Sequence, residues 1–254
     1  MRFATWNVNS IRTRIDLVAS WLDTHRPDVL CLQETKCRDE DFPVEAIHRL
    51  GYETVLHGHD HWNGVAIVSR VGVEDVRRGF TGPQVAPFDE ARLIAARCGG
   101  VDVYSAYVPN GRALDDPHYL YKLVWLERLR AELMLRGGSE DETLVTGDFN
   151  VAPTDEDIYD PRRWRRRTHA SAPERSAISA LLELGFVDLG AEDHHFTWWN
   201  YRTAAERNMG LRLDLALAST PLSATVESCV VDVAARRVER PSDHAPVLIT
   251  TSSE

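Results

Sequence analysis

The segment Phe3–Gln33, FATWNVNSIRTRIDLVASWLDTHRPDVLCLQ, decides the fold that this sequence predicts. Apolar runs at Phe3–Val8 and Val29–Gln33 have the length and composition of strands. Between them, apolar residues recur at helical spacing over Ile11–His25, and Pro27 prevents the helix from continuing. The chain therefore opens as strand, helix, strand.

The rest of the chain mixes a few helices with many strands. Three helices are predicted: Ile11–His25 with Ser10 or Asn9 as N-cap, one from Asp116-Pro117 to Gly137-Gly138, and one from about Pro173 to Leu184 before Gly185. Further strands are predicted at Tyr52–His57, Val65–Ser69, Leu93–Cys98, Val101–Val108, Leu144–Thr146, Phe196–Trp199, Leu211–Leu217, Val226–Val233 and Val247–Ile249. These strands are too many for one plain sheet, and their alternation with helices is too irregular for a TIM barrel. We therefore expect one α/β domain over residues 1–254, with two packed sheets and helices outside.

Composition limits the functional class. The 254 residues are 43% hydrophobic, and no stretch of about 18 apolar residues occurs. The N-terminus enters a strand-like run directly, so we expect a soluble, cytoplasmic and monomeric protein with reduced cysteines. The net charge of −10 argues against a protein that coats nucleic acid by bulk electrostatics, although it allows a local basic site.

Such a basic site is present at Arg162–Arg167, which holds five arginines and a tryptophan and follows the acidic run Asp155–Asp157. One interpretation is a solvated charged loop. The other is a phosphate-backbone contact, in which arginine supplies bidentate hydrogen bonds and tryptophan stacks. Composition alone does not separate the two.

An Asp–His pair is predicted between two distant segments. In Leu211–Leu217 the leucines take one face of a strand, and Asp214 lies on the other. A buried unpaired carboxylate would cost several kcal/mol, so Asp214 needs a partner. His244, in Ser242–Pro246 (SDHAP), is the natural candidate, because an Asp–His pair fixes the tautomer of the imidazole. The alternative is a rim aspartate paired with Arg212.

Polar residues at other strand ends suggest metal and phosphate chemistry. Glu34 follows the run Val29–Leu32, where a carboxylate suits Mg²⁺, and Asn7 takes the same position on the first strand. Asp148 and Asn150 follow another strand and, in an extended segment, would project from one face as proton-transfer group and oxyanion donor. The alternatives are turn-forming polar residues at Asn7 and Glu34 and an Asx-rich turn at Asp148.

Two aromatic positions add to this set. Tyr107 ends a strand before a Pro-Asn-Gly turn, where its phenol could bind phosphate or face water. Trp198 and Trp199 are adjacent on a strand, so one faces the core and the other would be exposed near the site. The alternating His57, His59 and His61 resemble a zinc site, but the spacing lacks a suitable further ligand. The chain also lacks a P-loop and a G-x-S-x-G motif.

Taken together, these strings resemble the endonuclease/exonuclease/phosphatase superfamily, and within it the exonuclease III type of AP endonuclease. The matching strings are Trp6–Arg12 (WNVNSIR), Leu32–Lys36 (LQETK), Asn63–Ile67 (NGVAI), Tyr107–Gly111 (YVPNG), Gly147–Asp155 (GDFNVAPTD), Leu211–Asp214 (LRLD) and Ser242–Pro246 (SDHAP). They span the chain in family order. The resemblance implies a four-layer α/β sandwich and a phosphodiesterase that depends on Mg²⁺, with Mn²⁺ as an alternative.

The resemblance also implies roles for individual residues. The implied catalytic residues are Tyr107, Asp148, Asn150, Asp214 and His244. The implied metal ligands are Glu34 with Asn7 and Asp243 nearby, and a second position at Asp148, Asn150 and His244. The implied substrate-binding residues are Asn110, Arg165, Trp198 and Asn208, with Trp198 in the segment Phe196–Arg202 (FTWWNYR) against an extruded abasic sugar.

Two departures from the family pattern bear on the substrate. Asn200 stands where an acidic residue is expected, and the Arg162–Arg167 cluster is richer than usual, which we interpret as a clamp on the DNA backbone. The expected function is cleavage of duplex DNA 5′ to abasic sites, accompanied by 3′-to-5′ exonuclease or 3′-phosphodiesterase activity. The alternatives are a phosphoesterase of the same fold acting on a lipid or small phosphate ester, and a catalytically inactive DNA-binding module.

Overall fold

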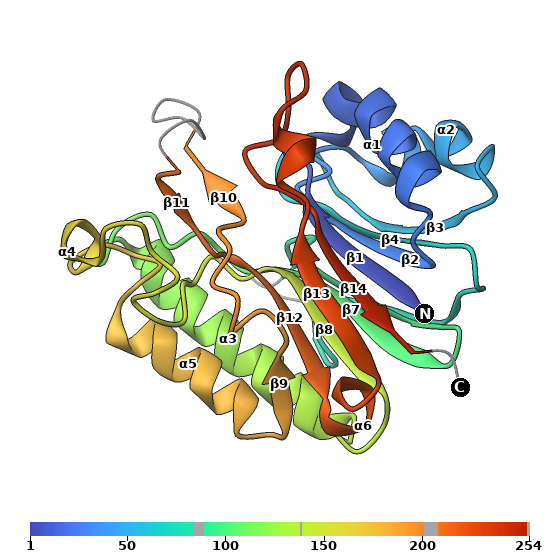
Figure 1. Cartoon of the computed structure of the whole chain (residues 1–254). Helices are drawn as coiled ribbons and strands as arrows, with labels where there is room; N and C mark the ends of the chain where they lie inside the picture. Colours follow the sequence, from blue (N-terminus) through green and yellow to red (C-terminus); the bar gives the residue numbers. More distant parts are fainter. Residues whose placement is uncertain (84–88, 138, 201–207, 253–254) are drawn as a thin grey trace.

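Two six-stranded sheets pack face to face, and helices cover both outer sides (Figure 1). The computed structural model describes residues 1–83, 89–137, 139–200 and 208–252. The strand orders are β13-β14-β1-β2-β4-β3 and β5-β6-β7-β8-β12-β9, and β10-β11 form a separate ribbon. The strands are β1 Arg2–Asn7, β2 Val29–Gln33, β3 Glu53–His57, β4 Val65–Ser69, β5 Glu74–Arg78, β6 Leu93–Cys98, β7 Val101–Tyr107, β8 Thr143–Asp148, β9 Phe186–Asp188, β10 Trp198–Trp199, β11 Gly210–Leu211, β12 Asp214–Ser219, β13 Val226–Val231 and β14 Val247–Thr251.

The helices form the outer layers, and their boundaries follow local signals. They are α1 Ile11–His25, α2 Val44–His48, α3 Pro117–Leu135, α4 Pro161–Trp164, α5 Ala172–Leu182 and α6 Thr220–Ser223, with 3₁₀ turns at Asp39–Asp41 and Val233–Arg236. Asp116 caps α3 by accepting a hydrogen bond from the His118 amide, as predicted. Ser171 and Glu174 form a capping box at the start of α5.

Three apolar layers explain why central strands are buried on both faces. Side chains of α1 pack on one face of the first sheet, and side chains of α3 and α5 pack on one face of the second sheet. The other faces of both sheets meet in a third cluster, where Phe3 and Ile67 lie with Ile94 and Ala216. Because successive strand residues point to opposite faces, each central strand supplies two layers. The predicted four-layer α/β sandwich is thus confirmed.

Ser10 stands at the N-cap position of α1, as one of the two predictions has it. It makes no side-chain capping hydrogen bond, however, and its φ is +90°. Instead, the backbone amides of Ser10 and Ile11 donate to the carbonyls of Glu34 and Thr35, at 2.7 and 3.1 Å. The loop after β2 therefore caps α1, which leaves the Asn9 side chain available for contacts elsewhere.

The predicted strand Leu211–Leu217 is interrupted. Residues 210–211 pair with β10, whereas Asp214 onward pairs with β8 and, from Leu217, with β9. At the break, the amides of Leu213 and Asp214 both donate to the Thr197 hydroxyl at 3.0 Å. A side-chain acceptor there replaces the strand partner. The short strands β5 and β9 had no apolar pattern strong enough to predict.

Several other expectations concern the chain as a whole. All four cysteines are free. Within the described residues, no helix combines the length and apolar character needed to cross a membrane. Three residues named in the predictions lie outside the described residues. They are the second glycine of the predicted helix stop at Gly137-Gly138, and Tyr201 and Arg202 of the segment Phe196–Arg202.

Candidate active site

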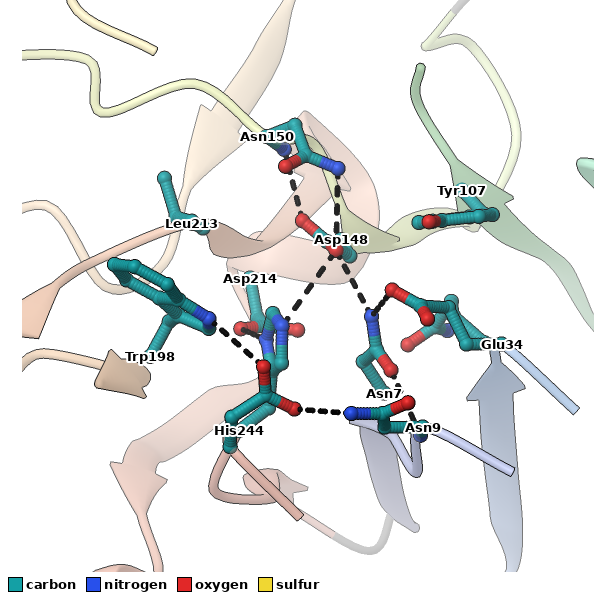
Figure 2. A network of polar contacts seen from close by, with 12 residues as sticks. Asn7, Asn9, Glu34, Tyr107, Asp148, Asn150, Trp198, Leu213, Asp214 and His244 are labelled. Carbon is teal, nitrogen blue, oxygen red and sulfur yellow. Dashed lines mark hydrogen bonds and ion pairs between the residues drawn. The ribbon is translucent and has the colours of Figure 1, made fainter. Parts of the chain in front are cut away.

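The ends of the central strands bring the predicted residues to one edge of the sandwich. In the second sheet, Asp148 pairs directly with Tyr107 on one side and with Asp214 on the other. Directly paired residues project from the same face of a sheet, so these three side chains form a row. In the first sheet, Asn7 is the last residue of β1 and pairs with Gln33, which precedes Glu34. Figure 2 shows the two sets facing one another.

Asn7 connects the two sheets. Its fully buried carboxamide donates to Glu34 Oε1 and to Asp148 Oδ2, each at 2.9 Å, and its Oδ1 accepts from the Asn9 amide at 3.0 Å (Figure 2). Every polar atom of the carboxamide therefore has a partner, which fixes its orientation. The first sheet is tied to the second through this side chain.

Glu34 is held in an unusual backbone conformation. Its φ is +53°, a region that L-residues other than Asn and Asp seldom adopt, and such residues cluster at functional sites. The carboxylate forms an ion pair with Lys36 at 2.6 Å. Burial alone would raise the pKa of Glu34, but Lys36 and the Asn7 hydrogen bond outweigh it, so the pKa is lowered. Glu34 is therefore an anion at neutral pH.

Tyr107 lies beside Glu34 as a neutral phenol. Burial, and then the negative charge of Glu34, raise the pKa of Tyr107 well above its ordinary value. The Arg92 guanidinium lies 4.7 Å from the centre of the Tyr107 ring, a cation–π distance. The hydroxyl thus keeps its proton and can donate a hydrogen bond.

Asp148 and Asn150 meet through a turn. Asn150 has φ of +52°, and its amide donates to Asp148 Oδ1 at 2.9 Å, which is an Asx turn. The prediction that both residues project from an extended segment is therefore wrong, and the alternative of an Asx turn is right. The Asn150 carboxamide still reaches Asp148 Oδ2 at 3.2 Å, so both residues address one centre.

Asp214 and His244 form the predicted pair. His244 Nδ1 lies 2.7 Å from Asp214 Oδ2, and Nε2 lies 3.8 Å from Asp148 Oδ2. Burial disfavours the imidazolium, but the Asp214 and Asp148 carboxylates outweigh this effect and raise the pKa of His244 to about 10. Burial raises the pKa of Asp148 to about 7. The negative charges of Asp214 and Glu34 add to this rise, and the charge of His244 opposes it. The alternative in which Asp214 pairs with Arg212 is wrong, because Arg212 binds Asp157 and Asp188.

Asp243 borders the same centre. Its carboxylate accepts from Asn9 Nδ2 at 3.0 Å and from the Trp198 indole at 3.1 Å. Burial raises the pKa of Asp243, but His244 and these two hydrogen bonds together lower it. Trp199 is 4% exposed, so the prediction of one core tryptophan is confirmed, and Trp198 is half-buried with its indole on Asp243.

The donor set fits a divalent cation. Four carboxylates, those of Glu34, Asp148, Asp214 and Asp243, gather around two cationic side chains, Lys36 and His244. Asp148, Asp214 and His244 offer ligand atoms within 4.8 Å of one another. A protonated imidazole lacks a free lone pair, however, so the carboxylates suit a hard cation better than His244 does. Among the described residues, His57, His59 and His61 do not form a metal-binding group.

The predicted substrate-binding residues separate into two groups. Asn110 belongs to the centre, since its Nδ2 donates to Asn150 Oδ1 at 3.2 Å. Arg165 instead lines a hollow with Asp155 and Arg175, and Asn208 accepts from the Trp199 indole at 3.2 Å, on the far side of the tryptophan pair.

A hollow of about 690 Å³ next to Asn110 is lined by other arginines, Arg112, Arg166 and Arg167. The Arg167 guanidinium lies 5.7 Å from the centre of the Trp164 ring. The part of the arginine cluster nearest the centre is therefore Arg166-Arg167, one residue beyond the position that the resemblance indicated.

Sequence reasoning missed several supporting residues. Asn9 links Asp243 to Lys36 through hydrogen bonds of 3.0 and 2.6 Å, and Ser242 donates to the Asn7 carbonyl at 2.7 Å. Asn9 and Ser242 lie within Trp6–Arg12 and Ser242–Pro246, two of the segments that match the family, so their position in the sequence indicates a place near the site. The buried Lys122 on α3 carries no such signal, since its partners come from distant loops and from α5.

Comparison with known proteins gives consistent results. The model of the endonuclease/exonuclease/phosphatase family matches residues 4–244. Exodeoxyribonuclease III of Haemophilus influenzae is 30% identical, with 97% of this chain and 98% of that protein covered. Among solved structures, an AP endonuclease from Archaeoglobus fulgidus is similar at 39% identity and a 3′ phosphatase from Neisseria bound to product DNA hairpin at 38%, each with a TM-score of 0.95 and full coverage of both chains.

Proposed function

We infer that the chain, which belongs to the endonuclease/exonuclease/phosphatase family, is a DNA-repair nuclease of the exonuclease III and AP endonuclease type. We propose that it hydrolyses the phosphodiester bond 5′ to abasic sites in duplex DNA, leaving a 3′-hydroxyl, and that it also removes nucleotides or blocking groups from 3′ ends. The observation that carries this proposal is the Asn7 carboxamide, which holds Glu34 and Asp148 around one centre beside His244.

In this proposal, Asp148 accepts a proton and His244 stabilises negative charge. A pKa near 7 suits Asp148 to accept the proton of the attacking water, because a general base works best when its pKa is close to the working pH. The imidazolium of His244, oriented by Asp214, would stabilise charge on the phosphate oxygens. The oxygen of the attacking water bonds to phosphorus, its proton goes to Asp148, and the bond from phosphorus to the 3′-oxygen breaks. That oxygen takes up a proton from solvent and leaves as a hydroxyl.

Asn150 and Tyr107 would complete the phosphate contacts. Both carry N–H or O–H donors next to Asp148, Asn150 through its carboxamide and Tyr107 through a phenol that stays protonated. Preorganised donors of this kind stabilise developing negative charge in a transition state. We propose that they bind non-bridging phosphate oxygens.

We further propose that Mg²⁺, with Mn²⁺ as an alternative, binds at Glu34 with Asn7 and Asp243 nearby. A bound divalent cation supplies charge neutralisation at the phosphate. The anionic Glu34 and the excess of carboxylates support this position. The second position, at Asp148, Asn150 and His244, has weaker support, because His244 holds its proton through Asp214.

The substrate is proposed to be duplex DNA, bound by an enzyme that acts as a cytoplasmic monomer. The hollow lined by Arg112, Arg166 and Arg167 adjoins Asn110, so backbone phosphates held there would continue into the centre. Trp198, next to Asp243, would contact the extruded sugar. The free cysteines agree with a reducing compartment.

One observation favours a second candidate, in which removal of 3′-terminal phosphates takes the place of abasic cleavage as the main activity. The centre of the Trp164 ring lies 6.5 Å from that of Trp198 and 5.6 Å from that of His169, so Trp164 already packs against both rings. A sugar that stacks on Trp198 has to share this space, whereas a 3′-terminal phosphate at Asp148 does not. The similarity to the 3′ phosphatase from Neisseria supports the same candidate.

Three DNA substrates test the proposal. They are a duplex with one abasic analogue, an undamaged duplex with a recessed 3′ end and the same duplex ending in a 3′-phosphate, each incubated with Mg²⁺ and with a chelator. We expect Mg²⁺-dependent cleavage 5′ to the abasic analogue and slower release at the recessed end. Release from the 3′-phosphate alone would establish the second candidate. Cleavage that persists with chelator would contradict the proposed metal dependence.

A further inference from the structure

Behind the centre lies a charged pair that the proposed chemistry does not use. The Lys122 side chain on α3 and the Glu174 side chain on α5 are both 0% exposed, and their charged atoms lie 2.5 Å apart. The other buried positions of α3 are mostly apolar, with Trp125, Leu126 and Leu129 among them. Burying two ions costs several kcal/mol each before their attraction is counted, and apolar residues of similar volume are often as stable. Packing of the helices therefore does not account for this pair.

The contacts of Lys122 point to the active centre. Its ammonium donates to the Asn150 carbonyl at 2.6 Å and also lies 3.4 Å from the Asn110 carbonyl. Asn150 and Asn110 are joined to each other through their side chains, and Asn150 contacts Asp148. One buried cation thus holds the backbone of two loops that carry site residues.

The Asn150 backbone is fixed at a defined point of the turn. Its φ of +52° lies in the left-handed region, which asparagine adopts more readily than most L-residues, and its orientation there depends on what its carbonyl contacts. Its carbonyl accepts from Lys122 and also lies 2.6 Å from His169 Nδ1, so both groups act on the same atom. Burial, together with Lys122, lowers the pKa of His169 to about 3, which keeps that imidazole neutral.

Glu174 places Lys122 and the loop before α5 at the same time. Its Oε1 accepts from the His169 amide at 2.9 Å and its Oε2 accepts from the Ser171 amide at 2.9 Å. The lysine counter-ion is therefore also the residue that completes the capping box of α5. The Glu174 carboxylate is therefore held both by the backbone amides before α5 and by Lys122.

We propose that the Lys122–Glu174 pair is a positioning device that holds Asn150 and the Asn110 turn in the geometry required for phosphodiester hydrolysis. Lys122 does not touch the substrate and acts through the Asn150 carbonyl. The inference rests on the proposed function, and it adds two positioning residues outside the site. It predicts that loss of the pair slows the chemical step and leaves DNA binding almost unchanged.

The test is the double variant Lys122→Met/Glu174→Gln in the full chain. Both replacements keep the approximate volume, and glutamine can still complete the capping box. With abasic duplex and Mg²⁺, we expect the single-turnover cleavage rate to fall about 10- to 100-fold, as small misplacements of reacting groups do, while the Kd for DNA changes less than about threefold. The side-chain amide resonances of Asn110 and Asn150 should shift in NMR spectra of the free protein.

The matched control is Arg130→Met/Glu127→Gln, which removes an exposed 3.0 Å ion pair from the same helix. It should leave rate, Kd and both resonances unchanged. Should the double variant fail to fold by circular dichroism, the single variant Glu174→Gln decides, with an expected three- to tenfold loss of rate. A folded variant with the wild-type cleavage rate, or one that loses DNA affinity instead of rate, would overturn the inference. Absence of cleavage by the wild-type protein would instead refute the proposed function.

Discussion

Arg212 and Asp214 stand two residues apart and are both buried, yet their surroundings differ. The Arg212 guanidinium makes hydrogen bonds of 2.6–3.2 Å to both oxygens of Asp157 and of Asp188. Asp214 has one oxygen on His244, and its Oδ1 is buried without a hydrogen-bond partner among the described residues. Burial and charge are common to both regions. What distinguishes the candidate site is that its groups still have capacity to bind.

The same contrast appears in the titration of the two regions. Burial would lower the pKa of Arg212, but Asp157 and Asp188 raise it, so the guanidinium stays charged at every accessible pH. Around His244, burial and the neighbouring carboxylates instead raise the pKa of Asp148 to about 7, and the carboxylates of Asp214 and Asp148 raise that of His244 to about 10. We therefore describe Asp157–Arg212–Asp188 as a saturated network and Asp148–His244–Asp214 as an unsaturated one.

The largest expected effect is loss of catalysis when the unsaturated network is broken. Asp148→Asn should lower the rate of abasic cleavage in Mg²⁺ by about 10³-fold or more, because it removes the proposed proton acceptor, and His244→Ala should have a similar effect. The free energy of unfolding of Asp148→Asn at pH 8 should be equal to or higher than that of the wild type, since the variant removes a carboxylate whose pKa is raised by burial. Single-turnover assays and urea denaturation measure the two quantities. Wild-type turnover in either variant would contradict the catalytic assignment.

Breaking the saturated network should have the opposite result. Arg212→Met leaves two buried carboxylates without their cation, which should lower the free energy of unfolding by about 3–5 kcal/mol. The cleavage rate per folded molecule should remain within about threefold of the wild type. Urea denaturation measures the free energy of unfolding. Active-site titration at low temperature counts the folded molecules, so that the cleavage rate can be expressed per folded molecule. A variant of normal stability that is inactive would show that the two networks are not separate in function.

A smaller effect is expected from pH on the protein in chelator. The folded pKa of Asp148, about 7, exceeds its ordinary 3.8, so its contribution to stability falls as the pH rises between about 4 and 7. The folded pKa of His244, about 10, exceeds its ordinary 6.5, so its contribution is complete below 6.5 and is lost as the pH rises toward 10. Both signs agree, and the free energy of unfolding should decline from mildly acidic pH to pH 10. The slope should be shallower in Asp148→Asn and unchanged by Arg130→Met.

The sequence predicts the unsaturated network better than the saturated one, for a physical reason. Most residues of the candidate site stand at strand ends, where sheet pairing brings them to one edge. These residues are Asn7, Glu34, Tyr107, Asp148 and Asp214. Arg212 instead binds Asp157, in a loop 55 residues away, and Asp188, at the end of the short strand β9 24 residues away, and neither segment has a strong periodic pattern. Asp157 therefore reads as part of an exposed acidic run, although it is 0% exposed.

The same limit applies to loop conformation. The strand Leu144–Thr146 and an Asx turn after it were predictable from local sequence, but the contact of the Asn150 carbonyl with Lys122 joins residues 28 apart. The groups that cap α1 could not be predicted from Asn9 and Ser10, because the capping carbonyls belong to the loop after β2. Local patterns thus predict elements and their ends, whereas contacts between loops require the tertiary structure.

The smallest expected effect concerns Trp198, at the margin of the unsaturated network. Its ring is half-buried against Trp164, and its indole donates to Asp243, so the residue could act by stacking or through that carboxylate. Trp198→Ala removes both contributions, whereas Trp198→Phe removes the N–H and keeps an aromatic face. If stacking on the sugar dominates, abasic cleavage should fall about fivefold in Trp198→Ala, corresponding to about 1 kcal/mol, and remain near normal in Trp198→Phe.

The ratio between two substrates separates these roles. Release of a 3′-terminal phosphate does not require a stacked sugar, so Trp198→Ala should change it less than abasic cleavage if the pocket assignment is right. Equal losses on both substrates in Trp198→Ala and in Trp198→Phe would instead show that the indole acts through Asp243, as a supporting group of the proposed metal position. Unchanged abasic cleavage in Trp198→Ala would show that Trp198 does not belong to the substrate pocket. Asp243 would then be the outermost group of the candidate site on that side.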